Sequence, residues 1–188
     1  MEIGDFLREI RTCKFCRADQ IDWKTPLVYS PISPTVVVVS EMPSIWAWNA
    51  DIGRVWAESH LLAGGTTGAP HTLCKWLGLD YREAISKLFW IQRANCAVTV
   101  GKHFAFQHCS SRFLDRALHL VKPKLILTLG KIAAQYFLRF DRLEDVMGRI
   151  RTYEGYDFVA LYHPSPAARK WQHRPEQQES IRLAKKRI

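Results

Sequence analysis

Four of the five cysteines fall into an arrangement typical of thiolate ligation. Cys13 and Cys16 form a C-x-x-C pair near the N-terminus, and Cys96 and Cys109 follow far downstream. Four thiolates complete either a zinc site or an iron–sulfur site. Zinc ribbons usually present two C-x-x-C pairs, whereas Cys96 and Cys109 lie further apart, so the spacing leaves zinc and a cluster equally open. Ordinary buried cysteines are the remaining alternative, and this is our interpretation of Cys74, which stands in an apolar segment.

The cysteines belong to a chain without a visible export signal. The first residues, Met-Glu-Ile-Gly-Asp, are partly acidic and contain no long apolar run. The longest apolar stretches, such as Val36–Val39 and Leu125–Leu129, are too short to span a bilayer. We therefore expect a cytoplasmic protein without membrane association, in which the cysteines bind metal or a cluster and do not form disulfides.

The composition indicates a folded, basic protein. The chain has 188 residues, 47% of them hydrophobic, which suits a single domain over residues 1–188 with an N-terminal cluster-binding segment. We expect a monomer. The formal net charge of +9 favours a polyanionic partner such as nucleic acid, because a basic surface raises the local concentration of polyanions.

The hydrophobic pattern predicts an α/β fold. Apolar runs rich in β-branched residues predict four strands buried on both faces: Thr35–Ser40, Phe89–Gln92, Leu125–Leu129 and Phe158–Leu161. Stretches with apolar residues near the helical period predict helices: Leu73–Leu79, Ser111–Val121, Lys131–Leu138 and Glu176–Lys186. Strands that alternate with helices predict a three-layer α/β/α architecture around a central, mostly parallel four-stranded sheet.

Polar or turn-forming residues follow each predicted strand. In open sheets of this kind, ligands bind outside the carboxyl ends of the strands. The segments at those ends are Ser40–Ser44, Gln92–Asn95, Gly130–Lys131 and His163–Pro166. Because parallel strands bring their carboxyl ends to the same edge, we expect the four segments to meet there and form a site.

Three motifs follow one another along the chain. They are Val-Val-Val-Val-Ser-Glu-Met-Pro-Ser (36–44), Lys-Pro-Lys-Leu-Ile-Leu-Thr-Leu-Gly-Lys-Ile-Ala-Ala (122–134) and Tyr-His-Pro-Ser-Pro (162–166). Together with the order of the cysteines, they resemble family 4, the iron–sulfur branch of the uracil-DNA glycosylase superfamily. The resemblance spans residues 13–171. It implies that Cys13, Cys16, Cys96 and Cys109 hold a four-iron, four-sulfur cluster in a structural role, with zinc as the runner-up.

The resemblance also implies an activity. A DNA glycosylase of this kind hydrolyses the N-glycosidic bond of a flipped-out uracil or modified pyrimidine in DNA and leaves an abasic site. The reaction separates a base that carries negative charge from a sugar that approaches an oxocarbenium ion, so it needs a donor for the base and a negative or water-orienting group near the sugar. His163 suits the first role and Glu41 suits the second.

The same loops contain residues for binding the base and the DNA. We expect the base to contact four residues: Met42, Pro43, Gln92 and Trp46. We expect the DNA to contact six: Ser44, Lys131, Ser165, Pro166, Arg169 and Lys170. Extruding a base costs a few kcal/mol, and Trp171 is a candidate for the side chain that fills the vacated stack.

The sequence departs from the family pattern around the base. Gln92 stands where family 4 usually has an asparagine, and its amide reaches about 1.3–1.5 Å further. Met42 and Ser44 replace small residues. The usual stacking aromatic is not evident, since its place falls within Gly-Gly-Thr-Thr-Gly (64–68), and the candidate substitutes are Trp46, Trp48 and Trp56.

These departures leave the substrate open. One alternative is a glycosylase for a bulky modified base, such as hydroxymethylated or glucosylated cytosine of phage DNA, acting in antiphage defence and not in repair. A second is a non-catalytic nucleic-acid-binding protein on the same fold. Glu41 and His163 favour an enzyme, and the lack of a strand-end lysine suited to Schiff-base chemistry favours a monofunctional glycosylase.

Overall fold

The computed structural model describes residues 2–16, 33–43, 69–98, 102–165 and 170–188. Within these residues, five strands form one sheet in the order β2-β1-β3-β5-β4. The strands are β1 (Val36–Ser40), β2 (Leu88–Gln92), β3 (Leu125–Leu129), β4 (Arg151–Tyr153) and β5 (Tyr156–Leu161). Four of them are parallel, and β4 pairs antiparallel with β5 at the edge. The four predicted strands are confirmed, and β4 is an addition, because its mostly exposed residues form no apolar run.

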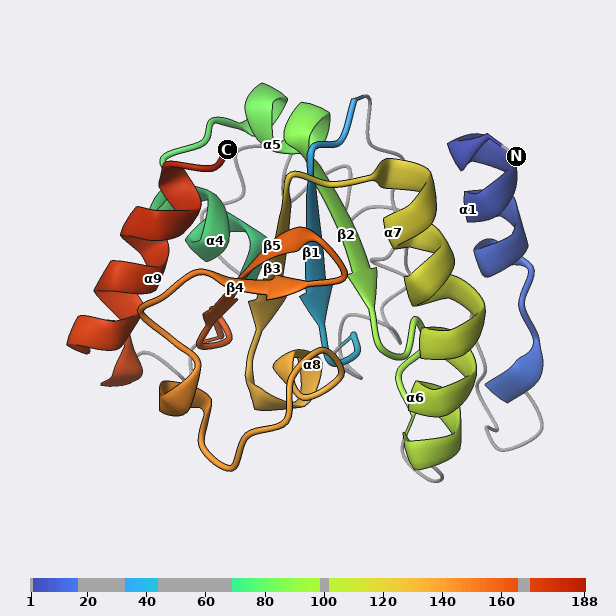
Figure 1. Ribbon diagram of the computed structural model, residues 1–188. Coiled ribbons are helices and arrows are strands. Elements are labelled where there is room, and N and C mark those ends of the chain that lie inside the picture. The colour runs from blue at the N-terminus through green and yellow to red at the C-terminus, as the bar shows by residue number, and fades with distance from the viewer. Residues whose placement is uncertain (1, 17–32, 44–68, 99–101, 166–169) are drawn as a thin grey trace.

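Helices cover both faces of the sheet (Figure 1). One face carries α1 (Ile3–Arg11), α6 (Lys102–Cys109), α7 (Asp115–Val121) and α8 (Lys131–Ala134). The other carries α4 (Ala69–Leu77), α5 (Tyr81–Lys87) and α9 (Pro175–Lys185). The predicted three-layer α/β/α architecture is therefore confirmed. No helix among the described residues has the length and apolar character needed to cross a membrane.

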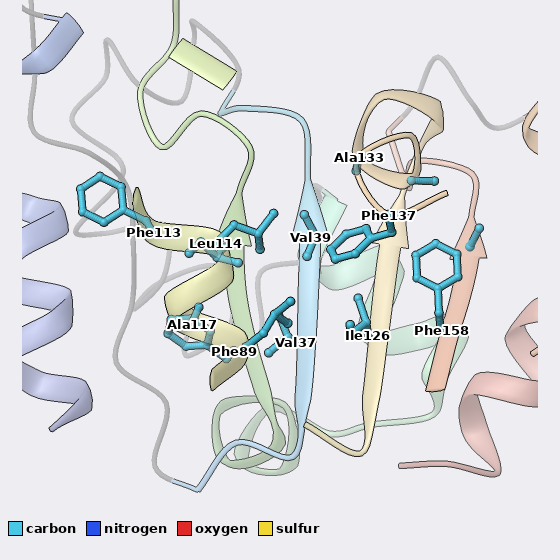
Figure 2. Close-up of a cluster of buried hydrophobic side chains, with 14 of the residues drawn as sticks. Val37, Val39, Phe89, Phe113, Leu114, Ala117, Ile126, Ala133, Phe137 and Phe158 are labelled. Atoms are coloured by element: carbon cyan, nitrogen blue, oxygen red, sulfur yellow. The ribbon is translucent and has the colours of Figure 1, made fainter. Parts of the chain in front are cut away.

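The core fills both sides of the sheet, because side chains alternate between the two faces along a strand. On the side of α1, α7 and α8, the buried residues include Val37, Val39, Phe89, Ile126 and Phe158 (Figure 2). Their neighbours on the same strands, such as Val36 and Val38, pack against α4 and α9. Both faces of each parallel strand are thus apolar, and the pairing aligns the strand ends, with Ser40 opposite Gln92 and Leu129 opposite Leu161.

The helices differ from the prediction mainly in extent. The predicted helix Ser111–Val121 is the second half of a longer helix that starts at Lys102, passes through a π-helical turn at Ser110–Leu114 and continues as α7. The helix predicted over Lys131–Leu138 ends at Ala134 as α8. The sequence analysis did not predict α1, α5 or α6, which is the first half of this long helix. A signal for α5 was present, because Asp80 and Glu83 form a capping box at its start.

We expect Ile126→Ala to destabilise the fold. Ile126 lies in β3, in the middle of the sheet, and is fully buried. Truncation removes apolar contacts and leaves a cavity, so the free energy of unfolding should fall by about 2–5 kcal/mol. Urea denaturation measures this change. The matched control is Thr152→Ala on β4, where the side chain is exposed and the change should stay within about 0.5 kcal/mol. Equal effects of the two substitutions would contradict the assignment of the core.

Candidate functional site

The carboxyl ends of the parallel strands meet at one edge of the sheet. Glu41 follows β1, Gln92 closes β2, Gly130 follows β3 and His163 lies two residues after β5. Main-chain hydrogen bonds continue past the strand ends, from Arg93 N to Ser40 O (2.9 Å) and from Gly130 N to Leu161 O (2.8 Å). In Figure 1 the arrowheads of β1 and β2 point toward this edge, where α8 also lies. The structure therefore brings together the four segments that the sequence analysis selected.

Glu41 and His163 lie on either side of β3. Their strands, β1 and β5, both pair with β3, and neighbouring strands are spaced by about 4.8 Å, so the two backbones are separated by roughly 10 Å. Gly130 stands between them with a positive φ of 90°, and a Cβ atom built on it would lie 3.6 Å from the His163 Cβ. Gly130 thus permits the tight turn into α8 and adds no side chain between the acid and the imidazole.

His163 is held in a largely buried position after β5. Burial lowers the pKa of its imidazole, because the charged form loses hydration. The preceding residue, Tyr162, donates its backbone N–H to Gln177 Oε1 at 2.9 Å, and the following residue, Pro164, is buried. At neutral pH the imidazole is therefore uncharged, and a neutral imidazole can donate one N–H hydrogen bond.

Arg93 is a cation beside Glu41 that the sequence analysis did not select. Burial lowers the pKa of its guanidinium, whereas Tyr136 and the Glu41 carboxylate raise it. The guanidinium donates to Ile132 O at 3.0 Å and lies 5.1 Å and 5.2 Å from the ring centroids of Phe106 and Tyr136. Arg93 directly follows β2, so the rule that selected Gln92 also covered it.

The edge of the sheet where the carboxyl ends of the parallel strands meet, which we call the rim, contains buried polar atoms without a hydrogen-bond partner. Gln92 is 6% exposed and its Oε1 has no partner among the described residues. Asn95 accepts from Gln92 N at 3.2 Å, yet its Nδ2 has no partner either. An unpaired buried polar group is costly and commonly marks a place that a ligand completes. This unpaired acceptor is consistent with the predicted contact between Gln92 and a base.

The four cysteines predicted as ligands share one neighbourhood. Cys13 and Cys16 follow α1, Cys96 follows β2, and Cys109 ends α6. Cys96 is hydrogen-bonded to Cys16 and interacts electrostatically with the other three thiols. All are free cysteines. The structure thus joins the N-terminal pair to the two downstream cysteines, although no element of secondary structure contains more than one of them.

The cysteines are surrounded by buried apolar side chains. Cys16 and Cys96 pack with Ala94, Ala97 and Val98. The hydrogen bond with Cys16, together with burial, raises the pKa of the Cys96 thiol, and burial raises that of Cys109 to about 12. Within the described residues, no group of three or more histidine, cysteine, aspartate or glutamate side chains is arranged to hold a metal ion.

His108 is a neighbour of the cysteines that the sequence analysis missed. Its Nε2 lies 3.8 Å from Cys13 Sγ, and its ring stacks on Phe15 with centroids 3.6 Å apart. Phe15 stands inside the C-x-x-C pair, so the stack ties that segment to α6. A histidine directly before Cys109 was a visible signal, but nothing in the spacing indicated which cysteine it faces.

The other predicted base and DNA contacts divide into three groups. Pro43 and Ser165 each lie two residues after Glu41 and His163, and Lys131 and Lys170 are exposed, with Lys131 at the start of α8. Met42 instead packs against the apolar cluster around Cys16 and Cys96. The remaining contacts lie outside the described residues, as do the alternative stacking residues: Ser44, Trp46, Trp48, Trp56, the glycine-rich stretch 64–68, Pro166 and Arg169.

Trp171 is packed and does not project freely. Its ring stacks on Tyr162 with centroids 5.7 Å apart at 19°, and the Arg174 guanidinium lies 4.0 Å from its centroid. The exposed Lys170 places its Nζ 4.9 Å from the same ring. A wedge role for Trp171 would require loss of these contacts, so the structure does not favour that hypothesis.

The lowered pKa of His163 makes stability depend on pH. In the unfolded chain a histidine titrates near pH 6.5, so between that value and the lower folded-state pKa the unfolded state binds more protons. The free energy of unfolding should therefore fall as the pH drops below about 6.5 and level off below the folded-state pKa. Urea denaturation between about pH 7 and 5.5 should show a smaller fall for His163→Asn than for wild type.

The matched control is His119→Asn, since His119 is exposed at the end of α7 and should leave the slope unchanged. The same slope for His163→Asn and wild type would contradict the prediction.

Comparison with known proteins identifies the family. The chain matches the family model of the Uracil DNA glycosylase superfamily over residues 27–185. This range contains all five described strands and the four strand ends of the candidate site, while Cys13 and Cys16 precede it. None of the curated proteins compared with the chain matches it. Because the family match covers most of the sequence, the chain belongs to the Uracil DNA glycosylase superfamily.

Proposed function

We propose that this protein is a monofunctional DNA glycosylase that hydrolyses the N-glycosidic bond of a flipped-out uracil or modified pyrimidine in DNA and leaves an abasic site. The observation that carries the proposal is the placement of Glu41 and His163 at the ends of β1 and β5, on either side of Gly130, in a chain of the Uracil DNA glycosylase superfamily. A target base inside a duplex is out of reach of these groups, so the nucleotide must first be extruded.

His163 acts on the departing base. As the glycosidic bond breaks, negative charge develops on the base, and a fixed N–H donor stabilises that charge more in the transition state than in the ground state. The largely buried, neutral imidazole supplies such a donor. One preorganised donor of this kind typically lowers the barrier by roughly 3–4 kcal/mol.

Glu41 acts on the sugar. The carboxylate orients the attacking water and stabilises positive charge that develops on the deoxyribose. Arg93 interacts electrostatically with Glu41, and its guanidinium is fixed by Ile132 O and the two aromatic rings. The acid and the imidazole thus serve the two fragments of the breaking bond.

Gln92 reads the base. Its buried, unpaired Oε1 is an acceptor that a base amino or imino N–H can satisfy. The longer side chain at this position places the base edge further from β2 than an asparagine would, and a modified cytosine of phage DNA stays the second candidate substrate. Uracil excision would serve repair, and excision of such a cytosine would serve antiphage defence.

DNA binding rests on the basic surface. The formal net charge of +9 favours the phosphate backbone, and the exposed Lys131 and Lys170 stand at the start of α8 and beyond the His163 segment. The predictions of a monomer and of a cytoplasmic location stay predictions.

We infer that Cys13, Cys16, Cys96 and Cys109 hold a four-iron, four-sulfur cluster, as in family 4. The support is their shared neighbourhood, to which the segments after α1, after β2 and at the end of α6 each contribute. A zinc ion needs four sulfurs at about 2.3 Å from one point, whereas a cluster spreads its thiolates over separate irons. The choice of a cluster over zinc rests on the resemblance to family 4. When bound, the cluster would cross-link the N-terminal segment, through Cys13 and Cys16, to the segments that carry Cys96 and Cys109.

We expect Glu41→Gln and His163→Ala to abolish most base release. Each removes a group that acts mainly in the transition state, so the single-turnover rate should fall about 10²–10⁴-fold for Glu41→Gln and about 10²–10³-fold for His163→Ala. The assay uses oligonucleotides that carry uracil, hypoxanthine, hydroxymethylcytosine or glucosylated hydroxymethylcytosine. Release of one base identifies the substrate.

The matched controls are Glu154→Gln and His119→Ala, because both residues are exposed and lie away from the carboxyl ends of the parallel strands. They should retain the wild-type rate. DNA binding without release of any base by the wild type would instead favour the non-catalytic alternative.

We expect Cys96→Ala and Cys109→Ala to remove the cluster, while Cys74→Ala retains it. Cys74 packs between α4 and the sheet, and burial raises the pKa of its thiol to about 11, which is typical of a packing residue. The measurement is iron, sulfide and zinc content with the visible absorption of protein purified without oxygen. Zinc in place of iron would support the runner-up, and a metal content that neither substitution changes would contradict the assignment.

A further inference from the structure

Tyr162, which directly precedes His163, is fixed at three points. Its backbone N–H donates to Gln177 Oε1 at 2.9 Å, its ring stacks on Trp171, and its hydroxyl donates to Glu144 Oε1 at 2.5 Å. Gln177 belongs to α9, and Glu144 to a short 3₁₀ turn, Leu143–Asp145. Segments from three parts of the chain therefore converge on the residue that presents the imidazole.

The contacts close into a ring. Arg174 donates to the same Glu144 Oε1 at 3.2 Å, and its guanidinium also lies 4.0 Å from the Trp171 centroid. Trp171 in turn stacks on Tyr162. Arg174 also donates to the Tyr162 hydroxyl at 3.5 Å, so each of the four side chains contacts at least two others, and none can move without loss of a contact to its neighbours. Only Glu144 contributes a carboxylate to this ring.

The charges of the ring are well defined. The hydrogen bond from Tyr162, with Arg142 and Arg174 nearby, lowers the pKa of Glu144, while burial and Glu144 raise the pKa of Tyr162 to about 12. The carboxylate is therefore ionised and the phenol protonated at neutral pH. A phenol that donates to a carboxylate forms a strong charge-assisted hydrogen bond, which restricts the Tyr162 side chain more than stacking alone.

We propose that Glu144 is a positioning residue, which acts through the Tyr162 hydroxyl to hold the His163 imidazole at the end of β5. This inference rests on the proposed glycosylase function, in which His163 stabilises the departing base. A preorganised donor must keep its place closely, and a misplacement of about 1 Å can cost about 10²-fold in rate. Because Gly130 packs beside His163 without a side chain of its own, the neighbouring Tyr162 is the anchor on which the imidazole depends.

The test compares Glu144→Ala with Asp157→Ala. Asp157 forms a matched carboxylate–arginine pair with Arg187 at 2.7 Å, at the opposite end of the same strand, β5. For Glu144→Ala we expect a single-turnover rate at saturating enzyme at least about 10-fold below wild type, with DNA affinity within about 2-fold. Asp157→Ala should leave both within about 2-fold, even if both variants lose some stability.

Tyr162→Phe removes the hydroxyl that donates to Glu144 Oε1 and accepts from Arg174, and it keeps the ring that stacks on Trp171. It should lower the rate as much as Glu144→Ala, and the double variant should be no slower than either single variant, because both remove the same interaction. A wild-type rate for Glu144→Ala, multiplication of the two losses in the double variant, or a loss of DNA affinity at unchanged rate would each overturn the proposal.

The position of the imidazole can also be measured without activity. The ring C–H signals of His163 in the NMR spectrum are identified by their absence in His163→Ala. They should shift in Glu144→Ala and Tyr162→Phe and stay in place in Asp157→Ala. If the wild type releases none of the bases in the assay, the glycosylase proposal fails, and this measurement decides the positioning of His163 separately: unshifted signals in Glu144→Ala would refute it.

Discussion

The register of the four parallel strands is the constraint on which the candidate site depends. Val37 and Val39 face one layer of helices and Val36 and Val38 the other, so a slip of β1 by one residue would exchange its two apolar faces and reverse the side of the sheet that Glu41 faces. Such a slip is costly because the side chains on each face interdigitate with those of the helices packed against it. The same packing that forms the core therefore sets which polar residue of each strand end reaches the rim.

The rim is built from groups that are costly to bury. The guanidinium of Arg93, the imidazole of His163 and the amide of Gln92 all lose hydration there. Arg93 is compensated by a carbonyl and two aromatic rings, whereas Gln92 keeps an unpaired oxygen. The unpaired Gln92 oxygen leaves an acceptor at the rim that a ligand can satisfy, as expected of a site preorganised for binding.

Two sets of contacts connect remote parts of the chain to this rim. Around the cysteines, the segment after α1 meets the loop after β2 and the end of α6, and the stack of Phe15 on His108 adds to this junction. Around Tyr162, the 3₁₀ turn with Glu144 and the segment with Trp171 and Arg174 meet the end of β5. Each set fixes one side of the rim through side chains that lie outside the strands.

The sequence by itself determined the four parallel strands, their carboxyl ends and hence Glu41, Gln92 and His163, because buried parallel strands leave a continuous apolar run that needs no knowledge of partners. The order of the cysteines along the chain also resembles family 4, and this resemblance predicted the four ligands. The tertiary structure alone decided that Met42 packs beside Cys16 and Cys96, that Arg93 lies beside Glu41, and that Glu144 contacts Tyr162. The physical reason is distance along the chain: such contacts join residues whose local pattern is that of an ordinary loop or surface, and they form only when the packed layers bring the segments together.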